Sequence, residues 1–228
     1  MTMVDDQMNA QEPSVAQSRE STYRFLSSAL IREMTAEFWA AVAQNPPVTE
    51  GALGEYLVSL KGADVEAVRS ENAVKYAKLL LNASSNPVIP YESPHTSPEH
   101  IMRQRSWTQV KAVFASNGFA LDECLNLPED HISFELEFMA LMCKREQELL
   151  DSCDATGLAS NRAVQRAFLT DHLLTWVDAF CDDLTWKSRG GFYAGIAETL
   201  KQFMTFEMEE FDISNDEIKY PKLEDSAE

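Results

Sequence analysis

Segment 127–143 most constrains how this chain can fold, because apolar residues cover more than one face of the helix that it would form. Pro128 suits an early helical position, and Glu129 and Asp130 complement the positive end of a helix dipole, so we expect the helix to begin at Pro128. The apolar positions that follow at helical spacing are Ile132, Phe134, Leu136, Phe138, Met139, Leu141, Met142 and Cys143. A helix that is apolar over so much of its circumference is surrounded by other helices. The segment therefore predicts the central helix of an all-α protein.

The rest of the chain is also helical in its periodicity. Apolar residues recur three and four positions apart, and prolines, glycines and capping residues separate the segments. We expect helices over 13–34, 35–44, 49–60, 64–82, 97–118, 168–184 and 192–204, with a break at 154–157. Segment 83–95 holds three prolines within eight residues, which predicts a long irregular loop that is either functional or a hinge.

These segments predict a single-domain helical bundle over residues 13–213, with the proline-rich loop across one face. We expect residues 1–12 to be a flexible N-terminus and residues 214–228 to be an acidic, disordered tail. The N-terminus has Asp5 and Asp6 where a secretory signal would carry Lys or Arg, and no apolar run exceeds six residues. We therefore expect neither an export leader nor a membrane span.

The charge of the chain narrows the kinds of partner that it could bind. It carries 37 acidic and 19 basic residues, for a net charge of −18. Nucleic-acid backbones and anionic membrane surfaces would be repelled, whereas a cationic partner would be attracted. The four cysteines, Cys124, Cys143, Cys153 and Cys181, form no CxxC pair. They are typical of reduced core thiols in a cytosolic protein, and we expect no metal site.

Two groups of residues are candidates for a functional site. His131 and Glu135 lie four positions apart on one helical face, and His172 follows Asp171 in a later helix. These three could serve an all-α metal- or nucleotide-dependent hydrolase, although neither an HExxH motif nor a P-loop is present. The other interpretation of His131 is a histidine at a helix start, hydrogen-bonded to its neighbours. In the proline-rich loop, the Tyr91-Glu92-Ser93 run places an aromatic ring beside an acid, which suits either binding or an ordinary turn.

With these segments in view, the chain resembles the TorD/DmsD/NarJ-type chaperones, which mature bacterial redox enzymes, over about 23–206. The family's E-P-x-D-H signature is similar to the run from Leu127 to His131, with Leu127 in place of the Glu. Its aromatic-x-x-Leu-Phe signature is similar to the run from Tyr76 to Leu80, with Leu80 in place of the Phe. Its proline-aromatic-Glu-Ser element matches the run that ends at Ser93. Further matches to the family's pattern are Asp171, His172, Leu173, Trp176, Phe192 and Tyr193.

The resemblance implies an all-α cytoplasmic chaperone, not an enzyme and without a cofactor of its own. Such a protein binds the twin-arginine leader of a molybdenum-cofactor oxidoreductase, engages the body of that subunit and assists its maturation before export. An acidic helical protein suits this leader, which is basic at one end and apolar after it. We expect no nucleic-acid partner and no membrane insertion. The chain would be a monomer, or a dimer formed by domain swapping through the long loop before Ser97.

The resemblance also indicates which residues would bind the leader. Asp130, and after it Glu135 and Glu92, would accept hydrogen bonds from the basic end of the leader. His131 would orient that end, and Tyr76 and Tyr91 would form apolar walls. The matched motifs add Ser93 and Pro128 to the leader-binding set.

Overall fold

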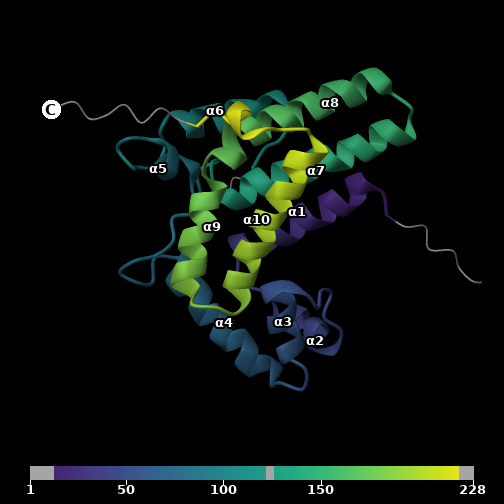
Figure 1. The fold of residues 1–228 in the computed structure, drawn as a ribbon. Helices are drawn as coiled ribbons and strands as arrows, with labels where there is room; N and C mark the ends of the chain where they lie inside the picture. Colours follow the sequence, from purple (N-terminus) through teal and green to yellow (C-terminus); the bar gives the residue numbers. More distant parts are fainter. Residues whose placement is uncertain (1–12, 122–125, 221–228) are drawn as a thin grey trace, which may run out of the picture.

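The computed structural model describes residues 13–121 and 126–220, and the regular secondary structure of these residues is helical, apart from one isolated β-bridge. Figure 1 shows the helices in sequence order. Their bounds are α1 Val15–Ile31, α2 Ala36–Gln44, α3 Gly51–Ser59, α4 Val65–Leu80, α5 Glu92–Thr96, α6 Arg105–Ser116, α7 Ile132–Asp151, α8 Ala155–Phe168, α9 Leu174–Ser188 and α10 Phe192–Glu210. A π-helical turn, η1 (Leu169–Leu173), joins α8 to α9, and a short 3-10 turn, η2 (Asn215–Glu217), follows α10.

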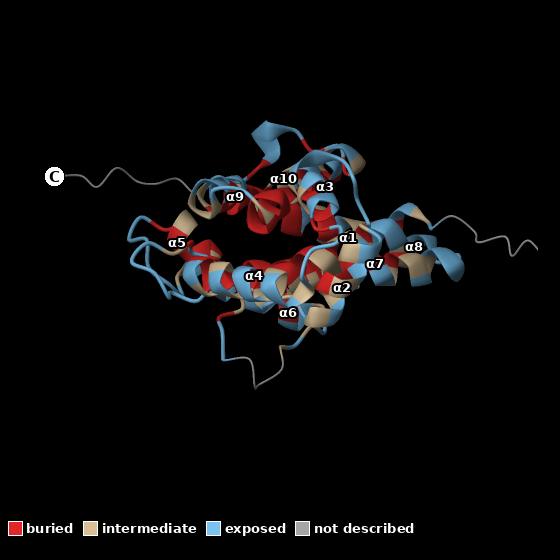
Figure 2. Ribbon diagram, turned by 90° about the horizontal axis from the view of Figure 1, so that it is seen from below, coloured by how far each residue is buried: buried red, intermediate tan, exposed pale blue. Residues whose placement is uncertain are grey.

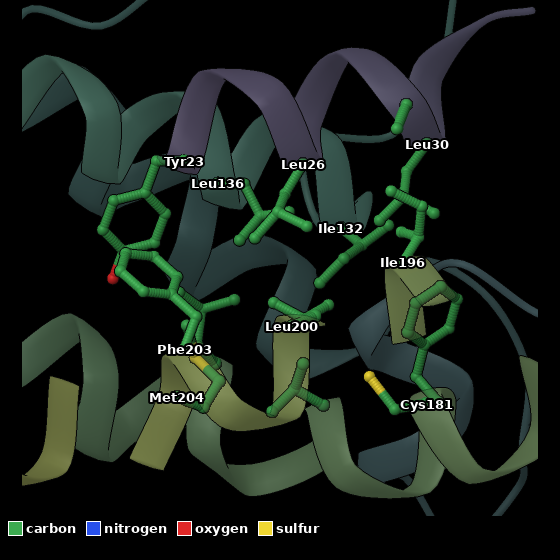
Figure 3. Close-up of a cluster of buried hydrophobic side chains, with 14 of the residues drawn as sticks. Tyr23, Leu26, Leu30, Ile132, Leu136, Cys181, Ile196, Leu200, Phe203 and Met204 are labelled. Carbon is green, nitrogen blue, oxygen red and sulfur yellow. The ribbon is translucent and has the colours of Figure 1, made fainter. Parts of the chain in front are cut away.

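The central position predicted for α7 is confirmed. Its first twelve residues are buried apart from two, Glu137 and Leu141. Helix α1 packs along α7, α8 packs on its far end, and α10 packs against α1, α3 and α9. Figure 3 shows α1, α7, α9 and α10 contributing Leu26, Ile132, Cys181 and Leu200 to one apolar cluster, and Figure 2 shows that buried residues face inward from every layer.

The helices begin where side chains satisfy their free amides. Ser14 and Gln17 form a capping box at α1, and the predicted cap of α2 is confirmed, since Thr35 accepts from the Phe38 amide. Asp64 and Asp154 cap α4 and α8 in the same way. Such caps stabilise a helix by about 1 kcal/mol each, and they explain why the starts of α1, α2 and α4 were predictable, whereas α8 was not predicted.

A buried arginine ties the first helix to the last. Arg19 of α1 is 1% exposed and donates to Glu207 of α10 at 2.6 Å, to Glu146 of α7 at 2.9 Å and to Gln165 of α8 at 2.6 Å. The Tyr23 hydroxyl donates to the second oxygen of Glu207 at 2.9 Å. Because a buried guanidinium is tolerated only when it is paired and hydrogen-bonded, this network fixes the four helices around one point.

Several predicted boundaries were wrong. Helix α7 begins at Ile132 rather than at Pro128, because the Pro128 to Asp130 run forms a turn before it. The proline-rich loop contains α5, which includes Pro94 at its third position, where a missing amide costs nothing. The predicted break at 154–157 is the capped start of α8, and the helix expected over 168–184 is one π turn followed by α9. The helix expected over 97–118 begins only at Arg105.

The C-terminal segment (residues 211–220) also differs from the expected disordered tail. Phe211, Ile213 and Ile218 are buried, and the Lys219 amide donates to the Thr170 carbonyl at 2.9 Å. Apolar burial therefore holds this part of the tail against the bundle despite its acidic composition. Residues 221–228, the expected flexible N-terminus at 1–12 and Cys124 lie outside the described residues. Of the other cysteines, Cys143 and Cys181 are buried thiols, as expected, and Cys153 is exposed.

Candidate functional site

The two motif-bearing segments of the sequence meet in a single β-bridge. Tyr91 and His131 pair in antiparallel fashion, with the Glu92 amide donating to the Asp130 carbonyl and the Ile132 amide donating to the Pro90 carbonyl, both at 2.9 Å. This bridge places the start of α5 against the start of α7. The acids that follow Tyr91 and precede Ile132 are thereby brought to one place in the interior.

Asp130 links the two helix starts through its side chain. It has no exposed surface, and its Oδ2 accepts from the Ser93 amide of α5 at 2.9 Å. Its Oδ1 is buried and has no hydrogen-bond partner in the part of the chain that the structure describes. Burial raises the pKa of Asp130, an effect that the hydrogen bonds from Ser93 oppose. Asp130 therefore caps α5, and not α7, with one oxygen and leaves the other unsatisfied.

His131, rather than Asp130, caps α7. Its Nδ1 accepts from the Ser133 amide at 3.1 Å, so the ring proton is on Nε2. Burial lowers the pKa of His131 to about 3, which keeps the imidazole neutral. The ring of Tyr91 packs edge-on against it, with 5.0 Å between the ring centroids. His131 is thus a histidine at a helix start, hydrogen-bonded to its neighbour Ser133.

Glu92 and Glu135 form the acidic centre of the site, and both are buried. The Glu92 carboxylate bonds His172 Nδ1 at 3.0 Å, and Glu135 Oε2 accepts from Trp176 Nε1 at 3.2 Å. Glu135 Oε1 accepts from no donor among the described residues, and the protonated Glu135 carboxyl shares a hydrogen bond with the Glu92 carboxylate. Burial raises the pKa of Glu135 well above its ordinary value, and the carboxylates of Glu92 and Asp130 raise it further. Burial also raises the pKa of Glu92, against the opposing effect of His172.

The remaining predicted residues surround this centre to different degrees. Ser93 and Pro128 are buried beside the bridge, and the Ser93 hydroxyl accepts from the Gln104 amide at 3.1 Å. Tyr91 is half-buried, and the Tyr76 ring packs against Tyr193 at 6.2 Å between centroids. Burial raises the pKa of Tyr76 to about 12, and the nearby Tyr91 contributes to that shift. Seven of the eight residues therefore lie at or beside the two helix starts, most of them inside the protein, whereas Tyr76 lies on α4 and packs against Tyr193 of α10.

The role of Trp176 as the hydrogen-bond donor to Glu135 was not predicted. His172 was a candidate only for the hydrolase hypothesis, and its bond to Glu92 was not foreseen either. The two lie four positions apart, a spacing that puts side chains on one helical face, and this was the available signal. The π turn η1, a feature often found at functional sites, sets the direction of His172.

A polar pocket of about 570 Å³ opens above Glu92, between α5, α6, η1 and the C-terminal segment. Its lining includes the carboxylates of Glu99 and Asp171 and the cations Arg105 and Lys219. Glu92 lines this pocket, and its carboxylate also bonds the buried His172. Of the three buried acids, Glu92 is the one that lines this pocket.

The described residues offer neither a metal centre nor a membrane span. Over 13–121 and 126–220, no group of three or more His, Cys, Asp or Glu side chains is arranged to hold a metal ion. His131, Glu135 and His172, the residues of the hydrolase hypothesis, instead bond Ser133, Trp176 and Glu92 respectively. In the same residues no helix is both long and apolar enough to cross a membrane.

The chain is an all-α bundle in which two motif-bearing segments meet over a buried acidic centre. The chain belongs to the family described as nitrate reductase delta subunit, which matches residues 44–182, and the resemblance to TorD-type chaperones is thereby confirmed. The names of the family and of its relatives indicate a chaperone, which is a non-enzymatic role.

Curated relatives named chaperone protein TorD match long stretches of the chain. Those of Photobacterium profundum and Vibrio atlanticus are each 25% identical, and each alignment covers 82% of this chain and 91% of the relative. The protein of Vibrio cholerae serotype O1 (strain El Tor Inaba N16961) is 27% identical over 134 residues, and this alignment spans 59% of each chain.

Proposed function

We propose that this protein is a cytoplasmic chaperone that binds the twin-arginine leader of a molybdenum-cofactor oxidoreductase and assists its maturation before export. Family membership and the relatives named chaperone protein TorD support the general role. The net charge of −18 supports a cationic ligand, because long-range attraction accelerates the encounter with a basic peptide.

The observation that carries the leader assignment is the unbalanced acidic centre. Asp130, Glu92 and Glu135 are three buried acids, and neither Asp130 Oδ1 nor Glu135 Oε1 accepts a hydrogen bond from a donor among the described residues. Burial favours the protonated form of Glu135, which shares a hydrogen bond with Glu92 and leaves Asp130 and Glu92 as the anionic acceptors. Leaving buried polar atoms unpaired is costly, so a ligand that supplies several N–H donors would be stabilised there. A guanidinium group offers five donors in a planar fork that matches carboxylates, which makes an arginine side chain the best fit.

Access to this centre requires movement of α5. Asp130, Ser93 and Glu135 have no exposed surface, so the leader reaches them only when α5 shifts away from α7. Helix α5 has five residues, and Asp130 holds its start through one side-chain bond. We assign Tyr76 and Tyr91 as apolar walls, His131 as the orienting residue, and Ser93 and Pro128 as the backbone frame of the opening.

Calorimetric titration with a leader peptide tests the assignment. The first peptide is a twin-arginine leader of a molybdenum-cofactor oxidoreductase from the same organism, and a second peptide has both arginines replaced by glutamine. We expect binding of the first and a loss of at least about tenfold for the second, the amount of one charge-assisted hydrogen bond. Glu92→Gln should weaken binding of the first peptide, whereas Glu148→Gln, which changes an exposed residue of α7, should leave its affinity unchanged. Equal binding of both peptides would contradict the proposal.

A further inference from the structure

The C-terminal segment is anchored at its start and middle and ends at the polar pocket. Arg166 of α8 donates to the Phe211 carbonyl at 3.3 Å and to the Glu217 carboxylate at 2.5 Å. Ile218 is buried, and the amide of Lys219 bonds the π turn at Thr170. These contacts lead the segment across η1, and Figure 1 shows it passing from α10 toward α6.

The side chain of Lys219 lies among carboxylates at the mouth of the pocket. Its Nζ is 2.7 Å from Asp171 Oδ1 and 2.8 Å from Asp171 Oδ2. Glu92 and Glu99 line the same pocket, and Arg105 is the other cation among its lining residues. A basic side chain from the chain's own end therefore occupies a site that is acidic without it.

An independent feature of the pocket indicates that it accepts a ligand rich in hydrogen-bond donors. Ser97 lines the pocket, is 7% exposed, and has a buried Oγ without a hydrogen-bond partner within 13–121 and 126–220. Buried hydroxyls in native proteins almost always have a partner, so an unpartnered one needs an explanation. A group with several N–H donors would satisfy this hydroxyl oxygen together with the carboxylates, which a single ammonium held by Asp171 does not do.

We propose that this pocket is a guanidinium-binding subsite and that Lys219 is its internal occupant, displaced when a leader arginine binds. The inference rests on the proposed function and deepens it. The side chains of Lys219 and Asp171 are 68% and 35% exposed, and exposed ion pairs contribute little to stability, so Lys219 leaves at small cost. A guanidinium binds a carboxylate through two parallel hydrogen bonds, which favours the exchange.

The position of Asp171 connects this subsite to the buried centre. Asp171 and His172 are consecutive residues of η1: Asp171 lines the pocket, and His172 bonds Glu92 inside. Glu92 lines the pocket as well. An arginine bound to Asp171 would therefore contact the residue next to His172, whose side chain bonds Glu92. The C-terminal segment, which places Lys219 on Asp171, competes with that arginine.

A double-mutant cycle with the leader peptide tests the competition. We expect Lys219→Ala to tighten leader binding about two- to fivefold, the range that loss of an exposed ion pair allows. Asp171→Asn should weaken binding at least about fivefold, and Lys219→Ala should have no further effect in that background. Lys201→Ala is the matched control, since Lys201 makes an exposed ion pair with Asp182 at 2.8 Å elsewhere on the surface, and leader affinity should not change.

Argininamide is a second probe that needs no client. Titration of the isotope-labelled full chain should shift the amide resonances of Asp171 and Glu99, at lower concentration in Lys219→Ala than in the parent. Absence of these shifts in both proteins overturns the subsite. A leader that binds the parent, Lys219→Ala and Asp171→Asn with equal affinity also overturns the subsite, but it leaves the proposed function intact. Argininamide binding at Asp171 without any leader binding supports the subsite and contradicts the proposed function.

Discussion

Glu135 is a buried acid whose charge is opposed by burial and by two neighbouring carboxylates, so its ionisation opposes folding. The pKa of Glu135 is higher in the folded than in the unfolded state. The free energy of unfolding of the parent is therefore highest below the unfolded pKa, where Glu135 is protonated in both states, and it falls as the pH rises through the folded pKa. Glutamine at this position cannot ionise and keeps an acceptor for Trp176. We expect Glu135→Gln to gain about 1.4 kcal/mol over the parent at pH 8 for each unit of pKa elevation, and to gain nothing at pH 4.

Urea denaturation of the parent and Glu135→Gln from pH 4 to pH 8 measures this difference. Glu148→Gln is the control, because Glu148 lies on the same helix and is exposed. A parent and a Glu135→Gln variant whose unfolding free energies remain parallel across this range would show that Glu135 does not carry the elevated pKa.

Asp130 allows a structural role to be separated from a binding role. Asp130→Ala leaves the buried Ser93 amide without its acceptor, so we expect it to lose about 1–3 kcal/mol of stability. Asp130→Asn keeps an oxygen acceptor for that amide but removes the charge. We expect it to unfold within about 1 kcal/mol of the parent and to bind the leader about 1.5–3 kcal/mol more weakly.

Chemical denaturation and calorimetry on the same Asp130 samples decide between these roles. Asp64→Asn, at the exposed cap of α4, controls for loss of a capping charge. If Asp130→Asn is folded and binds the leader as the parent does, Asp130 is only a cap for α5.

At the scale of elements, the close packing of α10 on α3 depends on Gly195. A Cβ at this position would lie 2.6 Å from the Leu53 Cα, and backbone at that distance cannot yield cheaply. Two effects then oppose each other: alanine raises helix propensity by about 1 kcal/mol, and overpacking costs about 1–3 kcal/mol. We expect the clash to dominate, so that Gly195→Ala lowers the melting temperature. A higher melting temperature would mean that α3 can move aside freely.

Element existence was largely predictable from the sequence, and element detail was not. Long periodic segments such as those of α7 and α10 were found because a buried stripe repeats every 3.6 residues. Helix α5 was missed because three prolines within eight residues predict a loop, whereas Pro94 lies in the first turn of α5, where a proline is tolerated. The π turn η1 was missed because one inserted residue leaves the apolar pattern on both sides intact.

The candidate site was predictable in its residues but not in their contacts. The segments around Tyr91 and His131 each stood out, but nothing local says that they pair. Glu92 bonds a histidine 80 residues later, and Glu135 accepts from Trp176 41 residues later. Such partners are set by tertiary packing, which spacing along one helix cannot reveal. For the same reason, acids expected to be open to a ligand lie in the interior.

At the scale of the whole molecule, the net charge of −18 predicts how leader binding responds to salt. Attraction between an acidic protein and a basic leader is screened over about 10 Å at 0.1 M salt and about 3 Å at 1 M. We expect leader affinity to fall at least about threefold between 0.05 M and 0.5 M sodium chloride, mainly through slower association. The Gln-for-Arg peptide is the control. Affinity that is constant over this range would mean that the charge serves solubility alone.

The pairing of Arg19 with Glu207 also determines when the bundle can be completed during synthesis. The two residues are 188 positions apart, so α1 leaves the ribosome long before its carboxylate partner exists. At roughly 5–20 residues per second, the interval is on the order of ten seconds or longer. Until α10 arrives, burial of the Arg19 guanidinium between α7 and α8 lacks its main counter-charge and is unfavourable. We therefore expect Arg19 of α1 to remain exposed to solvent during synthesis until α10 has been made.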